Sequence, residues 1–122
     1  MTVEACVTGN CTASKVPAYA VHPIRQMFDA GIRVALSCDN LTLSGDPEVV
    51  GAYPADGGLL YAHPSGEVAH LVADCGFGWA EAREVLVAGA RAAFAPEADA
   101  AFVAEFAAEV DRVLREEGLV EG

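Results

Sequence analysis

The chain has 122 residues, a length suited to one domain with a single hydrophobic core. Hydrophobic residues make up 53% of it and charged residues 20%, a composition that excludes an intrinsically disordered chain. The formal net charge is −11, from 18 acidic and 7 basic residues, and this negative field argues against nucleic acid as a partner.

The first forty residues are predicted to form a strand, a helix and a second strand. A strand begins at Val3 and gives way to a polar loop that runs to Cys11. Apolar residues recur at helical spacing over 18–30, where Pro23 fits the first turn and Gly31 follows as the stop. An apolar run over 32–38 predicts the second strand. Two strands joined by a helix favour a right-handed βαβ unit with parallel strands over 1–40.

The remaining residues are predicted to form a long loop and then helices. Residues 41–66 contain repeated glycine, proline and aspartate without a sustained period, which predicts a loop. Loops of this length are uncommon in small domains and often line a site. Residues 67–117 are predicted to be helical, in segments 67–74, 79–94 and from Pro96 to Glu117. In the last segment one apolar stripe is expected, formed by Phe102, Phe106, Val110 and Val113.

Polar side chains follow both predicted strands. Asp39 and Asn40 come directly after the second strand, and Gly9 and Asn10 follow the first. In parallel α/β folds the carboxyl ends of the strands carry the ligand-binding residues. Gly9 would let a ligand approach the backbone closely. A turn or a helix cap is the other interpretation of these residues, and spacing alone leaves both open.

The cysteines and histidines do not form a recognisable metal motif. There is no C-x-x-C pair, so the four thiols are interpreted as small buried hydrophobes in a reduced, cytoplasmic protein: Cys6, Cys11, Cys38 and Cys75. No two histidines lie at metal-binding spacing, and each is expected to cap, pack or face solvent: His22, His63 and His70. No stretch of 18 residues is apolar throughout, so no contact with a membrane is expected.

Several segments of the chain resemble adenosine deaminases. Residues 4–10 (Glu-Ala-Cys-Val-Thr-Gly-Asn), 22–24 (His-Pro-Ile) and 31–40 (Gly-Ile-Arg-Val-Ala-Leu-Ser-Cys-Asp-Asn) resemble the family's last two strands and the helix between them. The family has Cys-Pro-(Thr/Ser)-Ser-Asn, His-Pro and Asn-Thr-Asp-Asp at these places. Residues 76–79 and 89–96 (Gly-Ala-Arg-Ala-Ala-Phe-Ala-Pro) are similar to its segment Asn-x-x-x-(Ala/Ser)-Ser-Phe-x-Pro.

The resemblance implies a fold and a reaction. The fold would be a partial (β/α)8 TIM barrel, comprising the last two parallel strands and the C-terminal helices. The reaction would be the zinc-dependent hydrolysis of adenosine, a purine nucleoside, to inosine and ammonia. Asp39 would be a catalytic residue and a zinc ligand. Asn40 stands where the family has an aspartate that binds the purine N7, and its amide can also donate that hydrogen bond. Gly9 replaces the motif's second serine and would lie at the substrate rim.

Other residues of the family's site do not occur in the sequence. These are an early His-x-His, a later histidine and the glutamate of a His-Ala-Gly-Glu segment. Because catalytic zinc needs about three protein ligands, we expect the chain to be inactive alone. Its expected partner is the missing N-terminal portion of the barrel, or a second copy of itself. Two alternatives remain, a non-catalytic relic or interaction module, and a deaminase of AMP, adenine or another purine.

Overall fold

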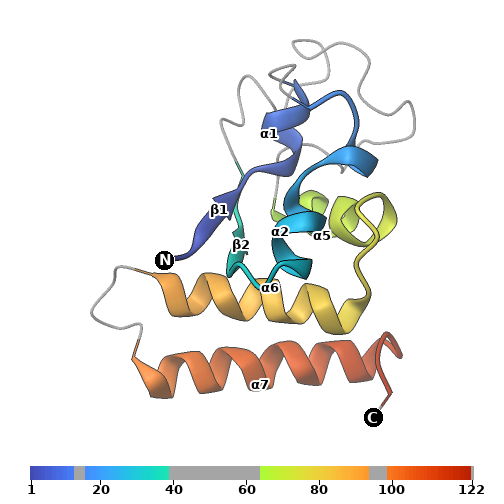
Figure 1. Ribbon diagram of the computed structural model, residues 1–122. Helices are drawn as coiled ribbons and strands as arrows, with labels where there is room; N and C mark the ends of the chain where they lie inside the picture. Colours follow the sequence, from blue (N-terminus) through green and yellow to red (C-terminus); the bar gives the residue numbers. More distant parts are fainter. Residues whose placement is uncertain (13–15, 39–63, 94–98, 122) are drawn as a thin grey trace.

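The structure is a computed structural model that describes residues 1–12, 16–38, 64–93 and 99–121 (Figure 1). These residues form a mixed α/β fold that is mostly helical and contains one two-stranded sheet. Among these helices none is both long and apolar enough to cross a bilayer. In chain order the elements are β1 (Val3–Ala5), α1 (Val7–Thr12), the 3-10 helix η1 (Tyr19–Val21), α2 (Ile24–Asp29), β2 (Val34–Leu36), α5 (Pro64–Ala73), α6 (Trp79–Ala92) and α7 (Ala100–Glu116).

The two strands are parallel, which confirms the strand order and direction predicted for the first forty residues. Val3 of β1 pairs with Val34 of β2, and Ala5 pairs with Leu36. The second strand is shorter than the predicted 32–38. Because the strands are parallel and in register, their carboxyl ends lie at the same edge of the sheet, close to α1.

Residues 7–12 form the helix α1, so the prediction of a polar loop after the first strand was wrong. The segment Val-Thr-Gly-Asn-Cys-Thr has a low helix propensity, and six residues are too few to form a stable helix alone. The stabilising contact comes from a distant segment. The carboxylate of Glu67 in α5, 59 positions away, accepts the backbone N–H of Thr8 in the first turn of α1.

The predicted helix over 18–30 consists of two shorter helices, η1 and α2. Pro23 is the residue that caps the start of α2. Gly31 has a φ of 78°, the left-handed conformation that lets glycine end a helix, as the sequence predicted. The guanidinium of Arg25 then joins α2 to α6, because it pairs with Asp29 of α2 and with Glu81 of α6.

The helices after the long loop begin and end near their predicted positions. α5 begins at Pro64, three residues before the predicted start, while most of the predicted loop lies outside the described residues. Gly78 caps α6, as predicted, and its N–H donates to Oε2 of Glu81 at 2.9 Å. This contact places a carboxylate beside the positive end of the helix dipole.

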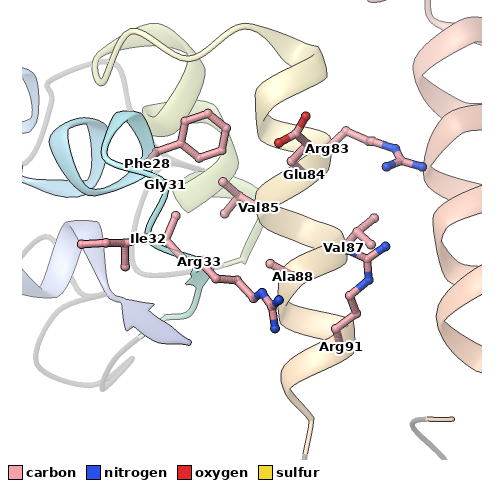
Figure 2. Close-up of a pocket in the computed structure, with 11 residues that line it drawn as sticks. Phe28, Gly31, Ile32, Arg33, Arg83, Glu84, Val85, Val87, Ala88 and Arg91 are labelled. Carbon is pink, nitrogen blue, oxygen red and sulfur yellow. The ribbon is translucent and has the colours of Figure 1, made fainter. Parts of the chain in front are cut away.

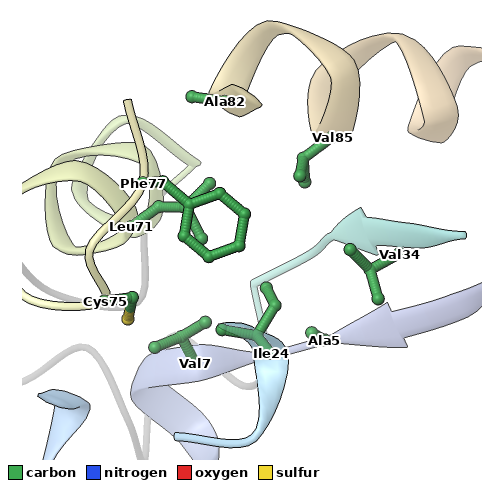
Figure 3. Close-up of a cluster of buried hydrophobic side chains, with 9 residues drawn as sticks. All are labelled: Ala5, Val7, Ile24, Val34, Leu71, Cys75, Phe77, Ala82 and Val85. Atoms are coloured by element: carbon green, nitrogen blue, oxygen red, sulfur yellow. The ribbon is translucent and has the colours of Figure 1, made fainter. Parts of the chain in front are cut away.

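The hydrophobic core lies between the sheet, α5 and α6. Figure 2 shows α6 beside the segment that leads into β2, with Val85 and Ala88 on the side of the helix that faces it. Leu71, from the second half of α5, is fully buried. Figure 3 shows the buried cluster, whose members come from six helices and strands and from the connection between α5 and α6: Ala5, Val7, Ile24, Val34, Leu71, Cys75, Phe77, Ala82 and Val85.

Helix α7 lies beside α6, away from the sheet (Figure 1). The two helices are linked by Arg83 and Asp111, whose side chains form hydrogen bonds of 2.8 and 2.9 Å. The predicted apolar stripe is only partly correct, since Phe102 is 44% exposed and Val113 is 42% exposed. Leu114 is the buried residue of this helix. The contact face is therefore rotated relative to the stripe.

Replacing Asp99 with alanine is expected to lower the free energy of unfolding by about 1 kcal/mol. Oδ1 of Asp99 accepts the N–H of Phe102 at 2.8 Å and so caps the first turn of α7. Chemical denaturation followed by circular dichroism measures the loss. Asp99→Ser keeps a capping oxygen and should retain most of the stability, whereas equal losses in both variants would contradict a capping role.

Candidate functional site

The candidate site lies at the carboxyl ends of β1 and β2, where the sequence predicted ligand-binding residues. Asp39 and Asn40 lie outside the described residues. After β2, the structure describes the chain only as far as Cys38. Gly9 and Asn10 lie within α1 rather than in a loop, and Gly9 is buried. The roles assigned to Asp39, Asn40 and Gly9 therefore stay predictions, and the neighbouring described residues define the geometry.

Glu67 is a fully buried carboxylate at the edge of this site. Its two oxygens each lie 3.2 Å from the backbone nitrogen of Thr8. Burial raises the pKa of this carboxyl, while hydrogen bonds from Thr8 and Val7 and the nearby His70 act in the opposite direction. Because its oxygens accept from the first turn of α1, Glu67 holds that helix against the end of β1.

A second polar chain connects α5 to η1. The imidazole of His70 stacks on the ring of Tyr19, with centroids 3.9 Å apart and the planes 6° apart. Nδ1 of His70 lies 2.6 Å from Oδ2 of Asp74. The Tyr19 hydroxyl lies 3.2 Å from the Thr8 hydroxyl, so this chain meets the Glu67 contact at the same residue of α1. One face of α5 thus positions both α1 and η1.

His22 links the start of α2 to α1. Its Nδ1 accepts the backbone N–H of Ile24 at 3.0 Å, so the neutral ring carries its hydrogen on Nε2. Nε2 lies 2.9 Å from Oδ1 of Asn10 and donates to it. The prediction that His22 caps or packs at a helix start is confirmed. Burial lowers the pKa of the His22 ring, which favours this neutral form.

Lowering the pH below about 6.5 is expected to destabilise the fold through His22. Between the lowered folded pKa and the ordinary value of 6.5, the unfolded chain binds a proton that the folded chain does not. The free energy of unfolding should therefore fall as the pH falls in this window, by at most about 1.4 kcal/mol per pH unit, and should be fully retained above it.

Urea unfolding at several pH values from about 5.5 to 7.5 measures this dependence, with His22→Asn as the comparison. Asparagine can cap Ile24 but does not titrate. The carboxyl of Glu67, whose pKa is raised, contributes the opposite slope to both proteins, so their difference isolates the histidine. Parallel pH profiles for the two proteins would contradict the assignment.

A cavity of about 260 Å³ opens beside Glu67, next to the end of β2. Ser37 and Cys38 line one side of it, and the start of α5, including Ser65 and Glu67, lines the other. Its polar groups are thus hydroxyls, a thiol and a carboxylate. Such groups can accept hydrogen bonds from, or donate them to, a small polar ligand. Two of the lining residues, Ser37 and Cys38, lie immediately before Asp39 in the chain.

The described residues do not form a metal centre. No group of three histidine, cysteine, aspartate or glutamate side chains among them could hold a metal ion. Cys75 is buried, as predicted, and the other three cysteines are half-buried. Burial raises the pKa of the Cys75 thiol to about 11, so it remains protonated and is a poor metal ligand at neutral pH.

The contacts of α5 were missed by sequence analysis. Sequence analysis assigned no role to Glu67 and left His70 to cap, pack or face solvent, whereas both side chains are buried in the structure. A signal does exist in the sequence. Glu67, His70, Leu71 and Asp74 occur at positions i, i+3, i+4 and i+7, which places three ionisable side chains beside a core leucine on one helix face.

Comparison with known proteins gives one partial similarity. A stretch of 42 residues, 34% of the chain, is 40% identical to a protein named "Probable adenosine deaminase" from Dictyostelium discoideum. The match spans only 5% of that protein's length. No protein-family model matches the chain. No solved structure matches it either. A third of the chain is therefore similar to a probable adenosine deaminase.

Proposed function

We propose that this chain supplies two adjacent strands and the following helices of a (β/α)8 barrel in a purine nucleoside deaminase. The main supporting observation is the parallel pair of strands β1 and β2, which are connected through α2. The carboxyl ends of the strands lie beside the hydrogen bonds of Glu67 with Thr8 and of His22 with Asn10. In a parallel barrel, this edge is where catalytic residues lie. The 42-residue similarity to a probable adenosine deaminase supports the same reaction class.

The unpaired edges of the sheet support a barrel as the complete fold. Within the described ranges, β1 and β2 each have only one neighbouring strand. Parallel sheets normally continue on both sides and are covered by helices. Six further strands would occupy both edges and close the barrel. The partner of this chain would then be the N-terminal portion of such a barrel.

Asp39 and Asn40 have distinct roles in this proposal. Asp39 is one ligand of the catalytic zinc, and Asn40 donates a hydrogen bond to the purine. The described residues do not fit a zinc site by themselves, so the other ligands belong to the rest of the barrel. Gly9 and Asn10 lie on α1 at the same edge, where Glu67 and His22 fix that helix.

Reconstitution tests the proposal. The chain is co-expressed with a polypeptide that carries the first six strands of an adenosine deaminase, and the purified complex is assayed for zinc content and for conversion of adenosine to inosine. We expect a complex with turnover, whereas neither part alone should show it. AMP and adenine, assayed in parallel, identify the preferred purine.

The reconstitution also separates the proposal from the alternative of a non-catalytic interaction module. Such a module would use the same open edges to bind a partner or a second copy, without chemistry. A stable complex that binds no zinc and leaves adenosine unchanged would support the module and contradict the deaminase. A chain that stays monomeric and forms no complex would contradict both.

A further inference from the structure

A larger cavity, of about 440 Å³, lies at the other end of the sheet (Figure 2). It is formed between the segment that leads from α2 into β2 and one side of α6. Phe28 and Ile32 line it from the first segment, and Ala88 lines it from α6. Its volume lies within the range of small-molecule sites. Among the described residues, none lines both this cavity and the cavity beside Glu67.

Positive charge is concentrated in this cavity, although the chain as a whole is strongly acidic. Three of the seven basic residues line it, Arg33, Arg83 and Arg91, with Glu84 as the one acidic lining residue among the described positions. The net charge of −11 is spread over the whole molecule, and its effect is screened beyond about 10 Å at moderate salt. A local positive site can therefore attract anions despite the overall charge.

Two of these arginines have no carboxylate partner within the described part of the chain. Arg83 forms its ion pair with Asp111 of α7, and Figure 2 shows its side chain extending toward that helix. Among the residues that the structure describes, no aspartate or glutamate pairs with Arg33 or Arg91. By contrast Arg25 and Arg112 are each paired with two carboxylates.

The side chain of Arg33 extends from the start of β2 toward α6, where Ala88 and Arg91 lie (Figure 2). Guanidinium groups offer planar pairs of N–H donors that match the oxygens of phosphate groups. The rest of the lining is largely apolar, with an aromatic ring at Phe28 and an aliphatic side chain at Ala88. The cavity thus combines an anion-binding end with an apolar wall.

We propose that this cavity binds a small organic phosphate, with its phosphate group on Arg33 and Arg91 and its apolar part against Phe28 and Ala88. The charges of the cavity and its apolar wall support this site independently of the proposed deaminase function. A doubly charged phosphate suits two guanidinium groups because each can donate two hydrogen bonds to it. The apolar wall favours a phosphate ester over inorganic phosphate.

Binding is tested by titrating the ¹⁵N-labelled chain with phenyl phosphate and following backbone amide shifts by NMR. We expect saturable shifts at residues around Arg33 and Arg91, weaker binding of inorganic phosphate, and no saturable binding of benzyl alcohol. Arg33→Gln and Arg91→Gln should each weaken the binding of phenyl phosphate about tenfold or more, since each removes charge-assisted hydrogen bonds.

Arg112→Gln is the matched control, because it removes the same charge from α7, outside the cavity. It should leave the affinity unchanged, and circular dichroism of every variant verifies that it is folded. Equal weakening in Arg112→Gln would reduce the effect to general electrostatics and overturn the proposal. Equal binding of benzyl alcohol, or tighter binding of a short polyglutamate peptide than of phenyl phosphate, would also overturn it.

Discussion

Replacing Glu67 with alanine is expected to lower the free energy of unfolding by about 3 kcal/mol. The substitution leaves the buried N–H of Thr8 without its acceptor, and such an unsatisfied group costs about 1–3 kcal/mol. It also removes packing volume from a fully buried position. Because α1 has little intrinsic helix propensity, its first turn should unfold together with this contact.

Glu67→Gln is expected to cost less than Glu67→Ala. Burial raises the pKa of Glu67, which means that the ionised form is disfavoured in the folded state relative to the protonated one. A neutral amide avoids that penalty and still offers one acceptor oxygen to α1. Glu105→Ala, at an exposed position of α7, is the control and should change stability by no more than about 0.5 kcal/mol.

Urea denaturation followed by circular dichroism orders the three variants. Amide hydrogen exchange adds a local measurement, since loss of the anchor should increase exchange in α1 more than in α6. If Glu67→Ala were as stable as Glu105→Ala, the carboxylate would not be the contact that holds α1 in place.

The sheet, α2 and α6 could be predicted from local sequence because their signals are local. The apolar run that contains Val34 and Leu36 marks β2, and Gly31 marks the end of the helix before it. The order strand, helix, strand then determines that the strands are parallel. The start of α6 is similarly marked by Gly78 and Glu81, which lie only three positions apart.

The helix α1 and its contact with Glu67 could not be predicted in this way, because this stabilising contact joins residues 59 positions apart. Local propensity around Thr8 and Gly9 favours a turn, and tertiary contacts override it. The same holds for the stacking of Tyr19 on His70. The position of Glu67 four residues before Leu71 indicates that it shares the buried face of α5. Its partner Thr8, however, is brought to it only by the tertiary fold.

These contacts give the candidate site a simple physical logic. α1 and η1 carry the polar groups at the carboxyl end of β1, and neither is stable as an isolated segment. α5 supplies Glu67 and His70, which hold both elements at the sheet. A substitution on α5 should therefore disturb the position of Asn10 and its bond to His22 without touching either residue.

Replacing Asp39 with alanine is expected to abolish the activity of the reconstituted complex with the first six barrel strands. Loss of residues that merely support zinc ligands costs about 10–100-fold, so loss of a direct ligand should cost at least about 100-fold in turnover, together with loss of bound zinc. Asp46→Ala removes the same charge seven positions further along the chain and should leave both readouts unchanged. Asn40→Asp should retain zinc and turnover, because a protonated carboxyl can still donate to the purine. Zinc binding and turnover that survive in Asp39→Ala would contradict the assignment of this aspartate.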